Sequence, residues 1–311
     1  MSGAIYCLGP LVLDRILTVD DLPGHDEKAF IKEKEERAGG PPLNCAWALS
    51  RLGEDARLVS TIGDDGEGAI LMQWLAERDM STEAVDVKAD SITASATIIV
   101  DRTGEKAILI DPVPVETLAV IGDSVSLQAD DTVVSNFFHP EAVARMFDRA
   151  AKTGIDRMID LELPEIERWG WQAMENILPF ASLVVTNRQV LEAWMARIGN
   201  ERPIAEAAEG LVRFLSGAGS RSAVVTLGSE GLVAIDGDAV FRLDAFKVTP
   251  RNTTGAGDVF LAGLAAAMRR GRKFKKALAF GTAAAAHFLQ TGRCDGAAAE
   301  ALMKDKMKER L

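Results

Sequence analysis

Cysteine is scarce in this sequence, and its scarcity narrows the class of protein. The chain of 311 residues has only Cys7, Cys45 and Cys294, and only three histidines. The cysteines are odd in number, scattered along the chain and without the spacing of a zinc site, which is typical of a reducing compartment. We therefore expect a cytoplasmic protein, and we interpret the equally scattered histidines as structural residues.

Positive charge and long hydrophobic runs are also lacking. The 35 Lys and Arg are outnumbered by 46 Asp and Glu, which gives a net charge of -11. Partners such as nucleic acid or anionic lipid need clustered cations, so we expect neither, although a local site for a phosphorylated ligand remains allowed. The apolar opening "AIYCLGPLVL" reaches Asp14 after ten residues. It is too short for a membrane span and has no basic stretch before it, so we predict a buried strand.

Alternating element types predict an α/β fold. Apolar, β-rich runs are separated by segments with helical spacing, which is typical of βαβ units and of a largely parallel sheet with helices on both faces. The predicted strands lie at 4–9, 56–61, 131–136, 156–161, 181–186 and 222–228, and amphipathic helices are predicted at 43–52, 205–216 and 274–290. We see no internal repeat and no linker.

Two stretches, 11–37 and 92–111, depart from this alternation. The first alternates weakly in hydrophobicity, and the second reads as a β-hairpin that turns at Thr103 and Gly104. We expect them to form one small sheet across an edge of the main sheet. Because a small sheet with one apolar face is hard to stabilise alone, we also expect a homodimer formed through it.

The stretch "NTTGAGDVF" at 252–260 carries the strongest chemical signal. A helix that begins here would expose backbone N–H groups and the positive end of its dipole, which attract phosphate, and Gly255, Ala256 and Gly257 would let it approach. Asp258 then lies beside an anion site. A carboxylate in that place can take a proton from an attacking hydroxyl while the N–H groups hold a transferred phosphoryl group.

Simpler explanations of this stretch stay open. Asp258 could serve only as a helix cap or compensate the helix dipole. A dinucleotide site is a remote alternative, because the third glycine of that fingerprint is missing and the stretch does not follow an opening strand. The chain has no G-x-x-x-x-G-K-[ST] motif, so a P-loop is excluded.

The order of several motifs resembles the ribokinase-like, or PfkB-type, carbohydrate kinase family. They are "LGPLVLDRI" at 8–16, "AGGPPLNCAWALSRLG" at 38–53, "IGDDGEG" at 62–68, "VVTLGSEGL" at 224–232, "NTTGAGD" at 252–258 and "GTAAAAHF" at 281–288. The resemblance covers nearly the whole chain. It implies a single domain, 1–311, with a three-layer α/β/α sandwich, a mostly parallel central sheet and a β-sheet lid made by the insertions at about 11–37 and 92–111. It also implies phosphorylation of a sugar-like alcohol by ATP with Mg²⁺.

The same resemblance implies roles for individual residues. Asp258 is similar to the catalytic base, and Gly255, Ala256 and Gly257 to the anion hole. The sugar-binding positions are matched by Asp14, Gly39, Gly40 and Asn44, and the nucleotide-binding positions by Asn187, Thr226 and Gly228. Simple structural roles are the alternatives for two of these, a helix cap for Asn44 and a turn acid for Asp14.

Two departures from the family pattern bear on the metal ions. Where the family often has Asn-x-x-Glu, "NRQV" places Val190 at the position of an acid that orders magnesium-bound water. We expect Glu162 to replace it through water, with Asp160 as a second candidate, because both follow a predicted strand; both could also be plain loop acids. Asn252 replaces the usual Asp near a monovalent cation, which puts activation by K⁺ in doubt.

The opening "GPLVLDRI" and the missing acid are more similar to ketohexokinase and sulfofructose kinase, which favours a ketose or a ketose derivative as acceptor. Phe137, Phe138 and His139 are predicted beside the acceptor pocket. The alternative functions are a nucleoside kinase and a binding regulator of low catalytic activity, the latter supported only by Val190 and Asn252.

Overall fold

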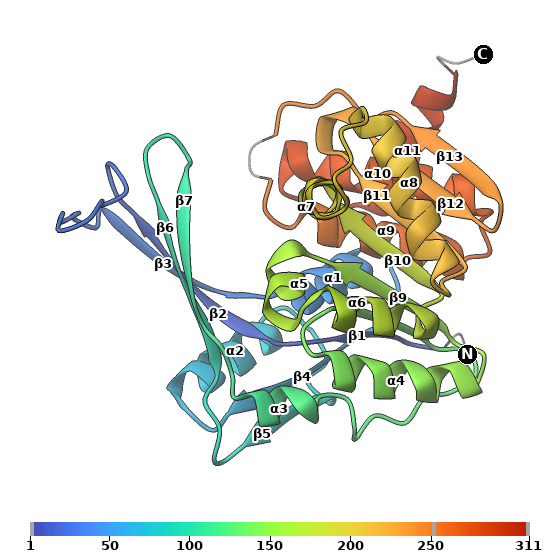
Figure 1. The fold of residues 1–311 in the computed structure, drawn as a ribbon. Coiled ribbons are helices and arrows are strands. Elements are labelled where there is room, and N and C mark those ends of the chain that lie inside the picture. The colour runs from blue at the N-terminus through green and yellow to red at the C-terminus, as the bar shows by residue number, and fades with distance from the viewer. Residues whose placement is uncertain (1–2, 251–252, 309–311) are drawn as a thin grey trace.

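The central sheet has nine strands in the order β13-β12-β11-β10-β9-β8-β1-β4-β5 (Figure 1). The structure is a computed structural model that describes residues 3–250 and 253–308, so Asn252 lies outside the described residues. From β11 to β5 all neighbours are parallel, and β12, next to one edge, runs antiparallel to both of its neighbours, β11 and β13. The strands are β1 Ile5–Leu8, β4 Ala56–Gly63, β5 Val85–Lys88, β8 Thr132–Asn136, β9 Asp156–Leu161, β10 Leu183–Asn187, β11 Ser222–Thr226, β12 Leu232–Asp236 and β13 Ala239–Leu243. The predicted mostly parallel sheet is confirmed.

Helices cover both faces of this sheet. One core contains residues of α1 Pro41–Arg51, α2 Gly66–Ala76, α9 Ala256–Arg269, α10 Phe274–Thr291 and α11 Gly296–Lys308. The other contains residues of α3 Val115–Ala119, α4 Pro140–Lys152, α5 Leu163–Trp169, α6 Trp171–Ile177, α7 Arg188–Ile198 and α8 Ile204–Gly217. The predicted three-layer α/β/α sandwich is therefore confirmed. In the part of the chain that the structure describes, no helix is long and apolar enough to cross a membrane.

All six predicted strands and all three predicted helices are present, within a few residues of the expected bounds. The two edge strands β5 and β13, and β12 next to β13, were not predicted from the sequence. Edge strands need not be apolar throughout. In β13 the five residues are all exposed or half-buried, so the strand lacks the continuous apolar run that marked the central ones.

A second sheet of four strands projects from the body, at the left of Figure 1. It has the order β3-β2-β6-β7, with β2 Val12–Thr18, β3 Glu33–Gly39, β6 Ala94–Val100 and β7 Lys106–Asp111. The strands β6 and β7 form the predicted hairpin, antiparallel with Val100 opposite Lys106. The stretches 11–37 and 92–111 thus meet in one sheet, which we call the lid sheet, and its closure over a substrate stays a prediction.

Candidate active site

Helix α9 begins where the Gly-Ala-Gly-Asp stretch predicted. Gly255 is its N-cap residue, with φ of +82°, a left-handed conformation that disfavours side chains. Among the described residues, neither Asp258 nor any other side chain caps the helix by a hydrogen bond. A Cβ added at Gly257 would meet no atom within 4 Å. The first N–H groups of a helix have no partner within it, so this open end can hold an anion.

Asp258 is fixed from another helix instead of capping its own. The Nδ2 of Asn44 in α1 donates a hydrogen bond of 2.8 Å to Oδ2 of Asp258, although the two residues lie 214 positions apart. Asn44 itself lies inside α1, whose N-cap residue is Gly40, so interpreting Asn44 as a helix cap is wrong. Burial raises the pKa of Asp258 to about 8, opposed by the Asn44 hydrogen bond and reinforced by Glu162. The carboxylate is therefore a stronger base than a solvated one.

Asp14 lies in β2 against Gly39 of β3, not in a turn. A Cβ at Gly39 would lie 2.2 Å from Oδ2 of Asp14, so only glycine leaves room for this carboxylate. Burial raises the pKa of Asp14, and Arg37, with Nε 3.8 Å from Oδ2, partly offsets the rise. The predicted sugar-binding positions Asp14, Gly39 and Gly40 thus lie on adjacent lid strands that lead into α1.

Three further acids gather at the carboxyl end of β9. Asp160 is in the strand, Glu162 is the N-cap residue of α5, and Glu165 lies in its first turn. Burial and repulsion from neighbouring carboxylates, Asp258 among them, raise the pKa of Asp160 well above its usual range, and burial raises that of Glu162. The pKa of Glu165 rises to about 7. Its Oε2 is buried and has no hydrogen-bond partner within the described part of the chain.

This excess of negative charge fits a cation. Within residues 3–250 and 253–308, no three His, Cys, Asp or Glu side chains converge closely enough to hold a metal ion directly. Oxygen donors that act through water suit Mg²⁺, which keeps several of its own waters. Glu162 and Asp160 lie at the carboxyl end of β9, as predicted from the sequence. Val190 is buried in the core, and its apolar side chain offers no oxygen donor.

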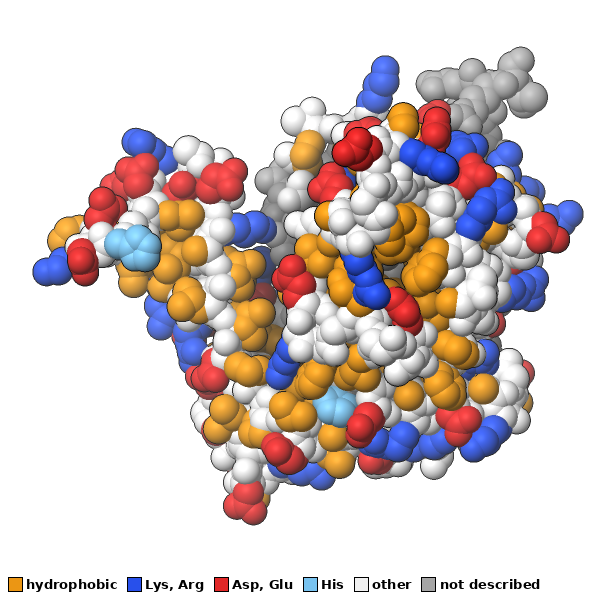
Figure 2. Space-filling model, viewed as in Figure 1, with side chains coloured by type: hydrophobic (Ala, Val, Ile, Leu, Met, Phe, Trp, Pro, Cys, Tyr) orange, Lys and Arg blue, Asp and Glu red, His pale blue; other side chains and the backbone are white. Residues whose placement is uncertain are grey.

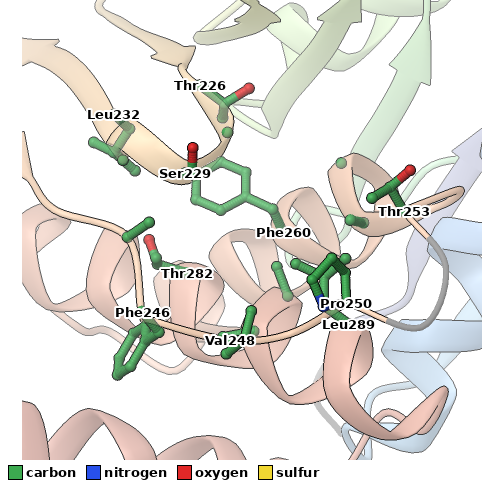
Figure 3. A pocket seen from close by; sticks show the side chains of 17 residues that line it. Thr226, Ser229, Leu232, Phe246, Val248, Pro250, Thr253, Phe260, Thr282 and Leu289 are labelled. Atoms are coloured by element: carbon green, nitrogen blue, oxygen red, sulfur yellow. The ribbon is translucent and has the colours of Figure 1, made fainter.

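An apolar cavity of about 440 Å³ lies on the other side of the α9 N-terminus (Figure 3). Its lining comes from the ends of β11 and β12, the segment 245–250, and helices α9 and α10. Both Thr226 and Gly228, predicted to bind nucleotide, line it together with Ala256 and Gly257. The remaining lining residues are Ser229, Gly231, Leu232, Ala245, Phe246, Val248, Pro250, Thr253, Phe260, Thr282, Ala285, Ala286 and Leu289. The volume and the apolar walls suit a purine nucleoside.

Four of the predicted positions make contacts within the fold itself. Asn187 caps α7, since its Oδ1 accepts from the N–H of Val190 at 3.2 Å, and its amide nitrogen can still donate to a ligand. Phe137 and Phe138 are buried in the core at 0% and 3% exposure. His139 caps α4 through Nδ1 and lies against Trp169, which gives this histidine a structural role.

Two features of the site were not predicted from the sequence: Glu165, and the segment that closes the cavity, which contains Phe246 and Val248. Glu165 follows Glu162 by three residues, and that spacing on a helix could have indicated that the two carboxylates are neighbours. The segment 244–250 forms neither helix nor strand, and its sequence has no periodic pattern. The sequence of this segment therefore does not predict that it forms the wall of a pocket.

An open helix N-terminus, a basic carboxylate beside it, and a purine-sized pocket on an α/β sandwich define a class of protein that handles phosphate esters of nucleotides. Residues 3–300 match the family model of the pfkB family carbohydrate kinases. The chain belongs to this family.

Individual relatives agree with this assignment. The chain is 27% identical over 298 residues to an ATP-dependent ribose-1-phosphate kinase of Halopiger xanaduensis, which covers 93% of this chain and 92% of that protein. The ribokinase of Thermotoga maritima has the same fold, with a TM-score of 0.81 and 23% identity over 97% of this chain and 99% of that one. A nucleoside kinase of Methanocaldococcus jannaschii also shares the fold, with a TM-score of 0.78 and 19% identity over 98% and 99% of the two chains.

The crowded acids predict an unusual dependence of stability on pH. The folded-state pKa of Asp258 exceeds its ordinary value of 3.8, so the folded protein holds more protons than the unfolded chain between pH 3.8 and about 8. The free energy of unfolding contributed by this group must fall as pH rises through that window. We expect Asp258→Asn to raise Tm relative to the unmodified protein, by little near pH 4 and most near pH 8.

Thermal melting of both proteins across this pH range tests the prediction. Asp130→Asn, at an exposed acid before β8, serves as a control and should give a difference that does not grow in this way. A constant or shrinking Tm difference for Asp258→Asn would show that its carboxyl group has an ordinary pKa.

Proposed function

We propose that the protein transfers the γ-phosphoryl group of ATP to a hydroxyl of a sugar or sugar derivative. One observation supports this most strongly: Asp258 lies at the open N-terminus of α9, held by Asn44, with the purine-sized cavity beside it. Asn44 follows directly from the Gly39-Gly40 turn that adjoins Asp14. The base, the anion site and the predicted sugar-binding positions therefore lie close together at one end of the central strands.

The residues act in the following way. Asp258 accepts the proton of the acceptor hydroxyl. The hydroxyl oxygen forms a bond to the γ-phosphorus. The bond from that phosphorus to the β-γ bridging oxygen breaks, and ADP leaves. The raised pKa of Asp258 favours this proton transfer. Backbone N–H groups of the Gly255–Gly257 turn hold the transferred group, and Asp14 and Asn44 fix the acceptor hydroxyls.

We propose Mg²⁺ as the cation of this site, with Glu162 as the residue that holds it through water and Asp160 as a second contributor. Magnesium supplies positive charge that offsets the triphosphate. The unpartnered Oε2 of Glu165 and the raised pKa values of its neighbours support a cation here. Because Asn252 lies outside the described residues, activation by K⁺ stays open.

A ketose or ketose derivative is the acceptor that we favour, on the resemblance of the opening strand and the missing acid at Val190. A nucleoside is the alternative, and a product screen against ketoses, aldoses and nucleosides separates the two. We place the protein in the cytoplasm, where sugar and ATP are its small-molecule partners, with no nucleic acid and no membrane. The three cysteines, all free and buried, are compatible with this compartment.

The catalytic role of Asp258 predicts a specific loss. Asp258→Asn keeps the size of the side chain and an acceptor for the Asn44 hydrogen bond but removes the base. We expect kcat to fall by about a hundredfold to ten-thousandfold, the usual contribution of a positioned general base. ATP affinity should hold or rise, because a negative charge near the phosphates is lost. Steady-state kinetics and nucleotide titration measure both effects.

Asp65→Ala is the matched control. Asp65 also lies at a helix N-terminus, where Oδ1 accepts from the N–H of Gly68 at 2.7 Å. This variant should lose at least about 1 kcal/mol of stability, because Asp65 also accepts from the N–H and the Oγ1 of Thr93, and it should keep its kcat. Near-normal turnover of Asp258→Asn together with a lowered Tm would mean that Asp258, like Asp65, is structural.

The magnesium proposal is tested by Glu162→Gln. The variant loses one negative charge at the cation site, so we expect the Mg²⁺ concentration for half-maximal rate to rise about tenfold, within the range seen when groups around a metal are changed. Glu167→Gln, at an exposed acid of the same helix α5, should leave this concentration unchanged. An unchanged Mg²⁺ dependence in Glu162→Gln would refute the role of Glu162.

We also propose a homodimer formed through the lid sheet. On β7, at the edge of this sheet, Ile108, Leu109 and Ile110 are 54%, 59% and 66% exposed. Hydrophobic side chains gather on the projecting lid in Figure 2. An exposed apolar edge strand invites pairing, and a second copy would cover it.

Light scattering at micromolar concentration should give twice the chain mass of 33.4 kDa. Leu109→Lys should return the mass of one chain, because a buried charge would oppose the interface. Ile198→Lys, at an isoleucine of α7 that is 50% exposed, is the control and should leave the mass unchanged. A single-chain mass for the unmodified protein would contradict the proposal.

A further inference from the structure

A second cavity, of about 510 Å³, lies between the lid sheet and the loop that precedes α9. All four lid strands contribute to it, and Pro250, Thr253 and Thr254 close the opposite side. Its lid lining consists of Ile16, Thr18, Glu35, Arg37, Ile98, Val100, Gly104, Lys106 and Ile108. The cavity therefore places two cations and one acid on a floor of mixed apolar and polar side chains, next to the anion hole of α9.

Arg37 is the unusual member of this lining. Its side chain is only 34% exposed, and its one ionic contact is with Asp14, at 3.8 Å from Nε to Oδ2. That separation is too long for a hydrogen bond. In the part of the chain that the structure describes, the guanidinium forms no side-chain hydrogen bond at all. The guanidinium is thus half-buried, with five N–H donors for which the described residues supply no hydrogen-bond partner.

Another arginine of the lid sheet, Arg15, has acids as hydrogen-bond partners. Arg15 follows Asp14 along β2, so its side chain lies on the opposite face of the sheet from that of Asp14. It donates to Glu36 at 3.3 Å and also to Glu67. Its side chain is exposed to a similar extent, at 29%. Acids are therefore available to arginine on the outer face, whereas on the inner face Arg37 meets only the carboxylate that we assign to sugar hydroxyls.

Lys106, the other cation of the cavity, already has a partner. Its Nζ donates to Oγ1 of Thr254 at 3.1 Å. In the sheet Arg37 is level with Asp14, whereas Lys106 is level with Thr18, four residues further along β2. At about 3.3 Å per residue the two levels are about 13 Å apart. Arg37 is thus the cation beside an acceptor that Asp14 holds.

We propose that the acceptor sugar carries an anionic group, a phosphate, carboxylate or sulfonate, and that Arg37 binds it. This inference rests on the proposed kinase function and names the substrate class. The planar guanidinium fork matches the oxygens of such groups and binds them through two parallel hydrogen bonds. Asp14 beside it then holds a neighbouring hydroxyl, and an acceptor without the charge leaves the donors of the half-buried guanidinium without a protein or ligand partner.

Matched acceptors test the proposal with the unmodified protein, ATP and Mg²⁺. Each uncharged ketose or aldose is compared with the same sugar bearing a phosphate, with its sugar acid, and with its sulfonate. We expect kcat/KM to be at least about a hundredfold higher for one anionic form, since a site built for a charged group discriminates strongly against its absence. The three anionic forms distinguish the source of the charge.

Variants then assign the preference to Arg37. Arg37→Gln should lower kcat/KM by about a hundredfold for the anionic acceptor and by less than about threefold for its uncharged counterpart. Arg37→Lys should recover part of the loss, because it restores charge without the fork. Lys34→Gln, which removes a cation from the outer face of the same strand, should change neither value. Melting curves confirm that each variant is folded.

Three results would overturn the inference. A preference of the unmodified protein for uncharged sugars would exclude an anionic acceptor while leaving the kinase function intact. An equal loss on both acceptors in Arg37→Gln would mean that Arg37 only positions Asp14. A rise in KM for ATP with every acceptor would assign Arg37 to the nucleotide. Failure to phosphorylate any acceptor, charged or not, would instead refute the proposed function itself.

Discussion

The arrangement of the candidate site depends on the hydrogen bond from Asn44 to Asp258. This 2.8 Å contact joins the helix after the Gly39-Gly40 turn to the helix after the Gly255–Gly257 turn. It brings the lid side and the nucleotide side of the molecule to one point. It also orients the carboxylate of Asp258 away from its own helix, so the N–H groups of α9 stay open to an anion.

The same point concentrates charge of one sign. Asp258, Asp160, Glu162 and Glu165 all have raised pKa values, and burial is the first cause in each case. Such crowding destabilises the folded chain at neutral pH, since each of these groups loses more by ionising here than in water. The arrangement makes sense if positive charge enters with the substrates. The unbound site is then poised to gain most from a cation and from a proton.

The main architecture could be predicted because burial leaves a pattern in the letters. Central parallel strands are covered on both faces and become continuous apolar runs, and a bare glycine turn before an acid marks an anion site. Edge strands such as β13 and the loop with Phe246 and Val248 carry no such pattern. Contacts between residues far apart in the sequence, such as that of Asn44 with Asp258, could not be predicted either. They depend on how helices are placed in space, and spacing along the chain does not encode that.

The two cavities on either side of the α9 N-terminus differ in how they can discriminate between ligands. The cavity beyond Thr226 is lined almost wholly by apolar and small residues, so it can discriminate between ligands only by their shape and volume. Such discrimination is sufficient for the nucleotide that we propose to bind there. The cavity under the lid presents charged groups, and one of them, Arg37, is half-buried without a hydrogen-bond partner among the described residues. A missing charge is penalised far more strongly than a missing methylene. If Arg37 binds the acceptor as proposed, the lid selects the acceptor, because Arg37 is the group there with the most donors left to satisfy.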